Sequence, residues 1–116
     1  MVIEMCRGDI FSCPIGIYIN GQLAHEEMDE VYFTVKTSHY IREPLFQKKA
    51  SDGSLPSDGN GSYVLTINPE DTNDLDFGAY EFDIEVVKLP TIKRTFTGYL
   101  ILAPEVTHAC NEVNAT

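Results

Sequence analysis

The sequence has no tryptophan, few basic residues and only three cysteines, at Cys6, Cys13 and Cys110. An odd and sparse set of cysteines argues against a disulfide framework and predicts free thiols in a reducing compartment. Eight basic residues stand against 18 acidic ones, which gives a net charge of −10. A surface this acidic repels phosphate groups, so neither nucleic acid nor an anionic membrane is expected as a partner.

The sequence also lacks long apolar runs. No segment approaches the roughly 18 consecutive apolar residues that a membrane-spanning helix needs. The first residues, MVIEM, have neither the basic start nor the apolar stretch of a secretory signal peptide. We therefore expect no membrane span and no export by the general secretory route.

What remains is the composition of an ordinary globular domain. Hydrophobic residues make up 43% of the 116 residues. A chain of this length buries enough surface for one core to be stable without metals or disulfides. We expect a single domain over residues 1–106, followed by a flexible C-terminal tail over residues 107–116.

Apolar and polar residues alternate along most of the chain, and helical periodicity does not recur. This pattern is typical of half-buried β-strands. The predicted strands lie at residues 9–19, 31–35, 44–50, 63–67, 80–86 and 96–102. Because Pro14 cannot donate to a ladder, it predicts an edge strand or a bulge. Lys48 and Lys49 are typical of a charged, protected edge.

Turn-forming residues separate these runs. Asn20-Gly21 predicts a tight turn, residues 51–62 an exposed and mobile loop, and residues 89–91 a turn into the last strand. The polar segment 70–76 predicts a single helical turn that crosses between sheets. The residues expected to face the core are Phe11, Cys13, Ile15, Ile17, Ile19, Val31, Phe33, Val35, Tyr63, Leu65, Ile67, Tyr80, Phe82, Ile84, Val86, Phe96, Gly98, Leu100 and Leu102. About seven short strands in one domain predict an all-β sandwich with Greek-key connections.

Tyr80 follows a turn at the start of a predicted strand, two residues after Gly78. This position matches the tyrosine corner of immunoglobulin-like folds, in which the phenol bonds back to the backbone a few residues upstream. A connection that crosses between sheets leaves backbone groups unpaired near the core, and a buried hydroxyl satisfies one of them. Gly78 and Tyr80 are therefore the predicted structural site. The alternative is that Tyr80 is only an inward-facing strand aromatic.

Several segments follow one another in a characteristic order: RGDIF at 7–11, DEVYFTVK at 29–36, LFQKK at 45–49, YVLTINPEDT at 63–72, FGAYEFDI at 77–84 and GYLIL at 98–102. This series resembles the N-terminal domain of baseplate upper proteins from tailed phages of Gram-positive bacteria. The resemblance spans roughly residues 3–106 and is most specific over residues 69–84.

The resemblance implies an immunoglobulin-like β-sandwich, a place in a phage or prophage tail, and no enzymatic activity or cofactor. Its implied partners are other tail or baseplate proteins, or a second copy of the chain. The implied location is the virion tail or baseplate, after synthesis in the bacterial host cytoplasm. In the family this domain anchors a longer chain with receptor-binding machinery. Since this sequence stops soon after its last predicted strand, we expect a stand-alone tail or baseplate subunit.

No metal site is expected. Cys6, Cys13, His108 and Cys110 lack the paired spacing of a structural zinc site. The carboxylates that a calcium site could draw on are Glu70, Asp71, Asp74 and Asp76. They do not follow a calcium-loop pattern, and around Asp58 the twelfth position is Pro69 instead of glutamate. Solvated turn residues are the better interpretation of these acidic side chains.

No catalytic constellation is visible either. The three histidines, at positions 25, 39 and 108, lie far apart, and no serine stands in a nucleophile-elbow context. The alternative to a tail protein is a carbohydrate- or host-binding module, a small adhesin-like β-sandwich. Sugar sites need two or three coplanar rings, and the outward candidates are Tyr18, Tyr32 and Tyr99. Three tyrosines on separate strands make a weak case for such a site.

Chelation tests the expected absence of a structural metal. A metal that binds only the native state raises stability by several kcal/mol at saturating concentration. We therefore expect the purified protein to melt at the same temperature with and without a strong chelator, measured by differential scanning calorimetry. A drop of many degrees in the presence of the chelator would show that a metal site was overlooked.

Overall fold

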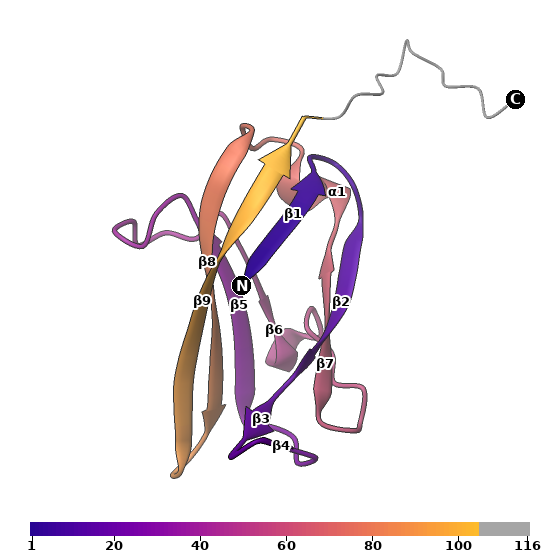
Figure 1. The fold of residues 1–116 in the computed structure, drawn as a ribbon, viewed down its shortest axis with the longest axis vertical. Helices are drawn as coiled ribbons and strands as arrows, with labels where there is room; N and C mark the ends of the chain where they lie inside the picture. Colours follow the sequence, from indigo (N-terminus) through magenta and orange to yellow (C-terminus); the bar gives the residue numbers. More distant parts are fainter. Residues whose placement is uncertain (105–116) are drawn as a thin grey trace, which may run out of the picture.

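The structure, a computed structural model, describes residues 1–104 (Figure 1). Its strands are β1 (Val2–Cys6), β2 (Phe11–Gly16), β3 (Tyr18–Ile19), β4 (Gln22–Leu23), β5 (Glu30–Lys36), β6 (Phe46–Lys49), β7 (Ser62–Ile67), β8 (Gly78–Lys88) and β9 (Ile92–Ala103). Within these residues the helical segments are two short turns, η1 (Ala50–Asp52) and α1 (Pro69–Thr72). The prediction of an all-β chain is confirmed. The predicted domain end at residue 106 and the tail over 107–116 lie outside the described residues.

The strands form one large sheet and two small ones. The large sheet has five strands in the order β1-β9-β8-β5-β6, while β2 pairs with β7 and β3 with β4. β1 runs parallel to β9, and every other strand pair is antiparallel. Figure 1 shows the β2–β7 pair on one side of the molecule and the five-stranded sheet on the other, with the core between them.

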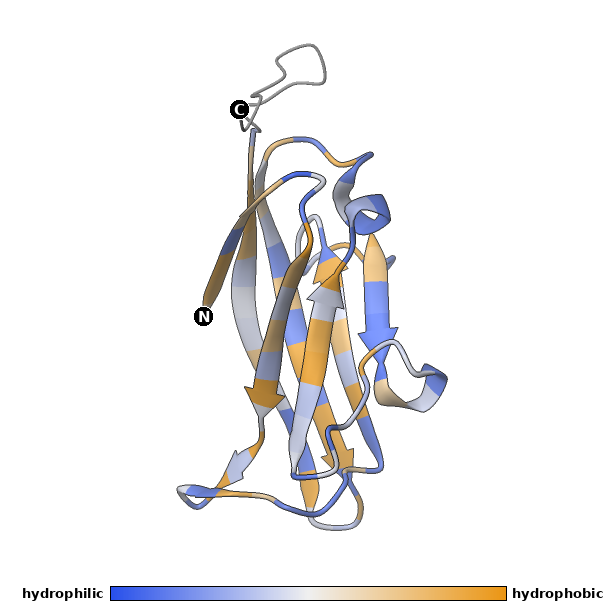
Figure 2. Cartoon of the chain, turned by 90° about the vertical axis from the view of Figure 1, so that its right-hand side faces the viewer, coloured by the Kyte–Doolittle hydropathy of each residue, from blue (hydrophilic) through white to orange (hydrophobic). Residues whose placement is uncertain are grey.

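Alternation of side chains builds this core from both sheets. Apolar and polar bands alternate along the strands in Figure 2. Val31, Phe33 and Val35 of β5 are fully buried, as is Ile67 of β7. The ring centroid of Phe33 lies 5.1 Å from that of Phe82 on β8. The inward faces predicted for β5, β7 and β8 are therefore confirmed. At the turn between β3 and β4, Asn20 and Gly21 both have positive φ, as predicted.

The N-terminal half of the chain differs from the prediction in two ways. Residues 9–19 form two strands instead of one, because β2 pairs with β7 whereas β3 pairs with β4. Strand β1 was missed altogether. It is only five residues long, and its buried Ile3 and Met5 are too few to stand out as a pattern. Pro14 lies on β2, which is at the edge of its two-stranded sheet, so the edge prediction is confirmed.

The segment between β6 and β7 is less exposed than predicted. Leu55, in the middle of the expected loop, is fully buried in the core. Its backbone N–H donates to the carbonyl oxygen of Lys49, and that of Val64 donates to Pro56. The expectation of an exposed loop over 51–62 is therefore wrong at Leu55, since a single apolar residue among turn formers carries no periodicity.

Strand β9 departs from its predicted face at one position. Leu100 and Leu102 are buried as expected, but Phe96 is 46% exposed. The reason is that β1 pairs only with residues 99–103 of β9, so Phe96 lies at an open margin of the sheet. Gly98 lies between the exposed Phe96 and the part of β9 that pairs with β1. A Cβ added at Gly98 would come within 2.5 Å of the Phe82 ring, so this position has no room for a side chain.

Lys48 was predicted to protect an edge with an exposed charge, but its side chain is not exposed. β6 is an edge strand, but the side chain of Lys48 is buried. Its Nζ lies 2.7 Å from Oδ2 of Asp71 on α1. The same Asp71 oxygen accepts a hydrogen bond from the backbone N–H of Asn68, which caps α1. One carboxylate therefore holds both the start of α1 and the edge of the large sheet.

Asp71→Asn tests this ion pair. The change leaves the buried Lys48 ammonium without its counter-charge, and we expect a loss of about 2–3 kcal/mol of unfolding free energy. Lys48→Met combined with Asp71→Asn should recover most of the loss, because no unpaired charge remains. Urea denaturation measures both values. Glu70→Gln, an exposed neighbour on the same turn, is the matched control and should change stability by less than about 0.5 kcal/mol.

Candidate functional site

Tyr80 satisfies a backbone group at the point where the chain crosses between sheets. Its ring is buried, and its hydroxyl donates to the carbonyl oxygen of Asp76 at 2.6 Å, four residues upstream. Asp76 belongs to the connection from β7 to β8, which lie in different sheets. Burial, together with the nearby Asp76 carboxylate, raises the pKa of Tyr80, so its hydroxyl stays a proton donor. The positive φ of Gly78, +138°, is one that side-chain-bearing residues rarely adopt.

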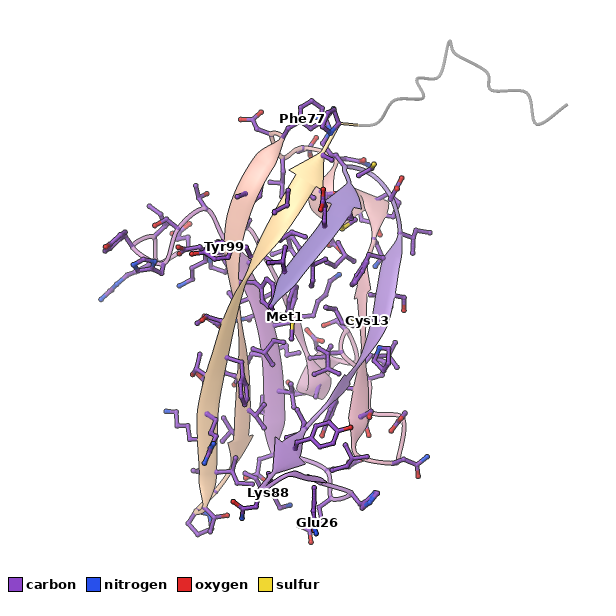
Figure 3. All side chains as sticks on the ribbon, viewed as in Figure 1. Met1, Cys13, Glu26, Phe77, Lys88 and Tyr99 are labelled. Atoms are coloured by element: carbon purple, nitrogen blue, oxygen red, sulfur yellow. The ribbon has the colours of Figure 1, made fainter. Side chains whose placement is uncertain are left out.

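Contacts that the sequence did not indicate surround this bond. The Arg7 guanidinium lies over the Phe77 ring at 4.2 Å, and its Nη1 donates to the carbonyl oxygen of Leu75. The Gly8 N–H donates to the hydroxyl of the fully buried Thr72 at 2.9 Å. The turn after β1 is thereby tied to the crossing connection, near the end of the molecule where Phe77 is labelled in Figure 3. These contacts fix the backbone of the crossing connection.

The outward face of the five-stranded sheet is lined with polar side chains. Glu81, Asp83 and Glu85 alternate along β8 on this face. In register they lie opposite Tyr99, Thr97 and Thr95 of β9, and opposite Lys36, Thr34 and Tyr32 of β5. The carboxylates therefore form an acidic stripe along the middle of the sheet. Burial raises the pKa of Asp83, although the charge of Lys36 opposes that effect.

A hollow of about 450 Å³ lies on this face between β9 and the loop that joins β5 to β6. His39 from that loop contacts Glu81 at 2.7 Å through Nδ1, and its backbone N–H donates to the same carboxylate. Lys36, Asp83 and Tyr99 also line the hollow. Acidic, basic and aromatic side chains therefore share the wall of the hollow.

Those residues weighed as metal ligands that lie within 1–104 are not grouped around a common point. Cys6 and Cys13 are free thiols on β1 and β2, and burial raises the pKa of Cys13. Asp71 is held by Lys48. Within residues 1–104 no three His, Cys, Asp or Glu side chains are grouped so as to hold an ion. His108 and Cys110 lie outside the described residues.

The three outward tyrosines do not form a platform. Tyr32 and Tyr99 share the outer face, but β8 lies between their strands. Tyr99 is paired with Glu81 of β8, which is paired in turn with Lys36 of β5. Lys36 is four residues along β5 from Tyr32. Tyr18 lies on β3, in a different sheet. These three rings are therefore not neighbours on one surface.

The first half of β9 presents an open backbone edge. The Tyr99 N–H donates to the carbonyl oxygen of Met1, and the Ala103 carbonyl accepts from Arg7, so these β9 residues turn their backbone groups toward β1. Because backbone direction alternates along a strand, Lys93, Thr95 and Thr97 turn theirs to the same side. β1 begins with Val2 in register with Tyr99, and Figure 1 shows its start beside the middle of β9. No strand among residues 1–104 pairs with 93–97 on that side.

All five residues from 93 to 97 are exposed. Other margins are blunted: Pro14 offers no N–H donor on the free side of β2, and on the free side of β7 the Pro56 carbonyl accepts from the Val64 N–H. A free row of donors and acceptors on a regular strand is a template for pairing with another strand. The open edge, defined as residues 93–97 of β9, is therefore the candidate functional site. No pattern in the sequence indicated this edge, because strand order in a sheet is not visible in local alternation.

Comparison with known proteins found no matching family model, no similar curated protein and no similar solved structure. The resemblance to phage baseplate proteins therefore stays a prediction from the sequence. No helix within residues 1–104 has the length and apolar character needed to cross a bilayer.

Tyr80→Phe tests the bond at the crossing connection. The change keeps the ring and removes only the hydroxyl, which leaves the Asp76 carbonyl without its donor. We expect a loss of about 1–3 kcal/mol of unfolding free energy, measured by denaturant melts. Tyr99→Phe, on an exposed ring, is the control and should stay within about 0.5 kcal/mol of the parent. Equal effects of the two changes would reject a structural role for the Tyr80 hydroxyl.

Proposed function

We propose that this chain is a non-catalytic docking module with an immunoglobulin-like β-sandwich fold, and that it is a structural component of a phage or prophage tail or baseplate. The order of the strands supports the fold. β2 and β7 take the places of strands B and E, and β5, β8 and β9 those of C, F and G. β6 then corresponds to the extra strand of variable-type domains. β1 departs from the constant-type pattern, because it pairs with β9.

The Tyr80 bond supports the same assignment. Immunoglobulin-like folds place a tyrosine near the start of strand F, with its hydroxyl bonded to the backbone a few residues upstream. Tyr80 is the third residue of β8 and bonds to Asp76. Gly78 at the start of the strand permits the backbone turn that leads into it.

The open edge of β9 is the observation that carries the docking function. Within residues 93–97, the backbone groups of Lys93, Thr95 and Thr97 are donors and acceptors that no described strand uses. A partner that supplies an extended segment would gain main-chain hydrogen bonds there, as in other cases of strand addition. The net charge of −10 disfavours nucleic acid and anionic membranes in comparison with protein partners.

The tail assignment rests on the ordered series of segments between residues 7 and 102. It places the protein in the virion tail or baseplate after synthesis in the bacterial cytoplasm. Other tail or baseplate proteins, or a second copy of the chain, are then its partners. A glycan-binding module is the second candidate, and the hollow beside Tyr99 favours it. The separation of the outward tyrosines counts against it.

Thr95→Pro tests docking at the edge. Its N–H points away from β8, so proline removes a donor from the open edge without breaking a bond inside the sheet. We expect the variant to lose binding to co-expressed tail proteins in a pull-down, while Thr95→Val, which keeps the N–H and the branched shape, retains it. Thermal melts confirm that both variants are folded. Equal binding by both variants would contradict the site, and selective binding on a glycan array with no tail-protein partner would favour the glycan-binding module.

A further inference from the structure

We propose that a second copy of this chain pairs with the open edge, with β9 running antiparallel to its own copy about a two-fold axis at Thr95. The inference rests on the proposed function, in which residues 93–97 of β9 are a strand-docking edge. The pairing would join the two large sheets into one continuous sheet across the axis.

The backbone of the open edge is complementary to itself in this register. Thr95 faces Thr95 of the second copy, and Lys93 faces Thr97 in both directions. All three residues turn their N–H and C=O groups away from β8 and toward the second copy. The bonds that Tyr99 and Ala103 make beside β1 establish this direction for the odd-numbered residues of β9. In an antiparallel ladder each such pair exchanges both backbone hydrogen bonds. No backbone group of the open edge is then left without a partner.

The inward side chains of the edge also match. Arg94 of one copy stands opposite Phe96 of the other, and both are exposed in the single chain. A guanidinium over an aromatic ring is an attractive arrangement, and the chain already contains one, in which Arg7 covers Phe77 at 4.2 Å. The pairing therefore covers Phe96, which is 46% exposed and faces the core side of β9 without reaching the core.

The outward side chains supply charge complementarity. Lys93 of the second copy lies beside Thr97, and Thr97 is in register with Asp83 on β8. The lysine stem is long enough to bring its ammonium toward the acidic stripe of Glu81, Asp83 and Glu85. Opposite charges on neighbouring strand positions are favourable. The basic start of β9 thus meets the one face of the sheet where carboxylates are concentrated.

Other registers are worse. Centring the axis on Lys93 or Arg94 sets like charges directly against each other. Centring it on Phe96 or Thr97 brings the second copy against Tyr99, whose backbone is already held by Met1. Thr95 is the centre that uses the whole open edge without either conflict.

Sedimentation equilibrium over micromolar to millimolar concentrations tests the pairing. The parent chain should form a weak, reversible dimer, since one strand pair buries less surface than a standard interface. Thr95→Lys puts two ammonium groups opposite each other at the axis and should lower the association constant at least about tenfold. Thr37→Lys adds the same charge at an exposed position on the β5–β6 loop and should leave the constant unchanged.

Hydrogen exchange of the parent chain gives a readout that needs no variant. The amides of Lys93, Thr95 and Thr97 should slow as the concentration rises, whereas those of Arg94 and Phe96 are already held by β8 in the monomer. Dimers in which the three amides stay fast, or in which Thr95→Lys has no effect, would overturn the proposed pairing. A chain that stays monomeric but binds a tail protein through the open edge would overturn it too, and would leave the proposed function standing.

Discussion

The register of β8 between β5 and β9 is the constraint on which the rest of the molecule depends. Its even-numbered residues from Tyr80 to Val86 are buried in the core, and its odd-numbered residues form the acidic stripe outside. A slip by one residue would exchange the two sets, burying carboxylates and exposing Phe82 and Ile84. The same register fixes which backbone groups of β9 bond to β8. It therefore also determines which backbone groups of residues 93–97 point away from β8, to the open edge.

Several polar groups near the core lie where the chain crosses from β7 to β8. Each has a partner of its own: Tyr80 bonds to Asp76, Thr72 to Gly8, and Lys48 pairs with Asp71. Unpaired, any of them would cost more than its bond contributes. The crossing is thus fixed by one local bond, from Tyr80 to Asp76, and by two contacts to segments far away in the sequence.

The sequence was sufficient to predict features that depend on neighbouring residues. Alternation identified the strands over Val31–Val35, Tyr63–Ile67 and Tyr80–Val86 and the faces they bury, because burial of one sheet face imposes that period. The position of Tyr80 after a crossing turn was also readable, and Pro14 marked an edge. These predictions need only the chemistry of a few consecutive residues.

The errors concern positions that distant segments determine. Lys48 has the sequence of an edge charge, yet its long side chain reaches Asp71 from another element. Leu55 is buried in a segment whose backbone bonds to Lys49 and, through Pro56, to Val64. Phe96 is exposed because β1 pairs only with residues 99–103 of β9. No local pattern reports the length of a neighbouring strand. The open edge of β9 was unpredictable for the same reason.

The parallel pairing of β1 with β9 has a mechanical consequence. The two strands are in register from Val2 with Tyr99 to Cys6 with Ala103, and they run in the same direction. A force that pulls the start of β1 and the end of β9 apart acts along both strands, so their hydrogen bonds are loaded in shear and share the load together. A hairpin such as β8–β9, pulled at its open end, would instead break its bonds one after another. β1 is thus placed as a clamp that resists extension, and its five residues set the force at which the fold would yield.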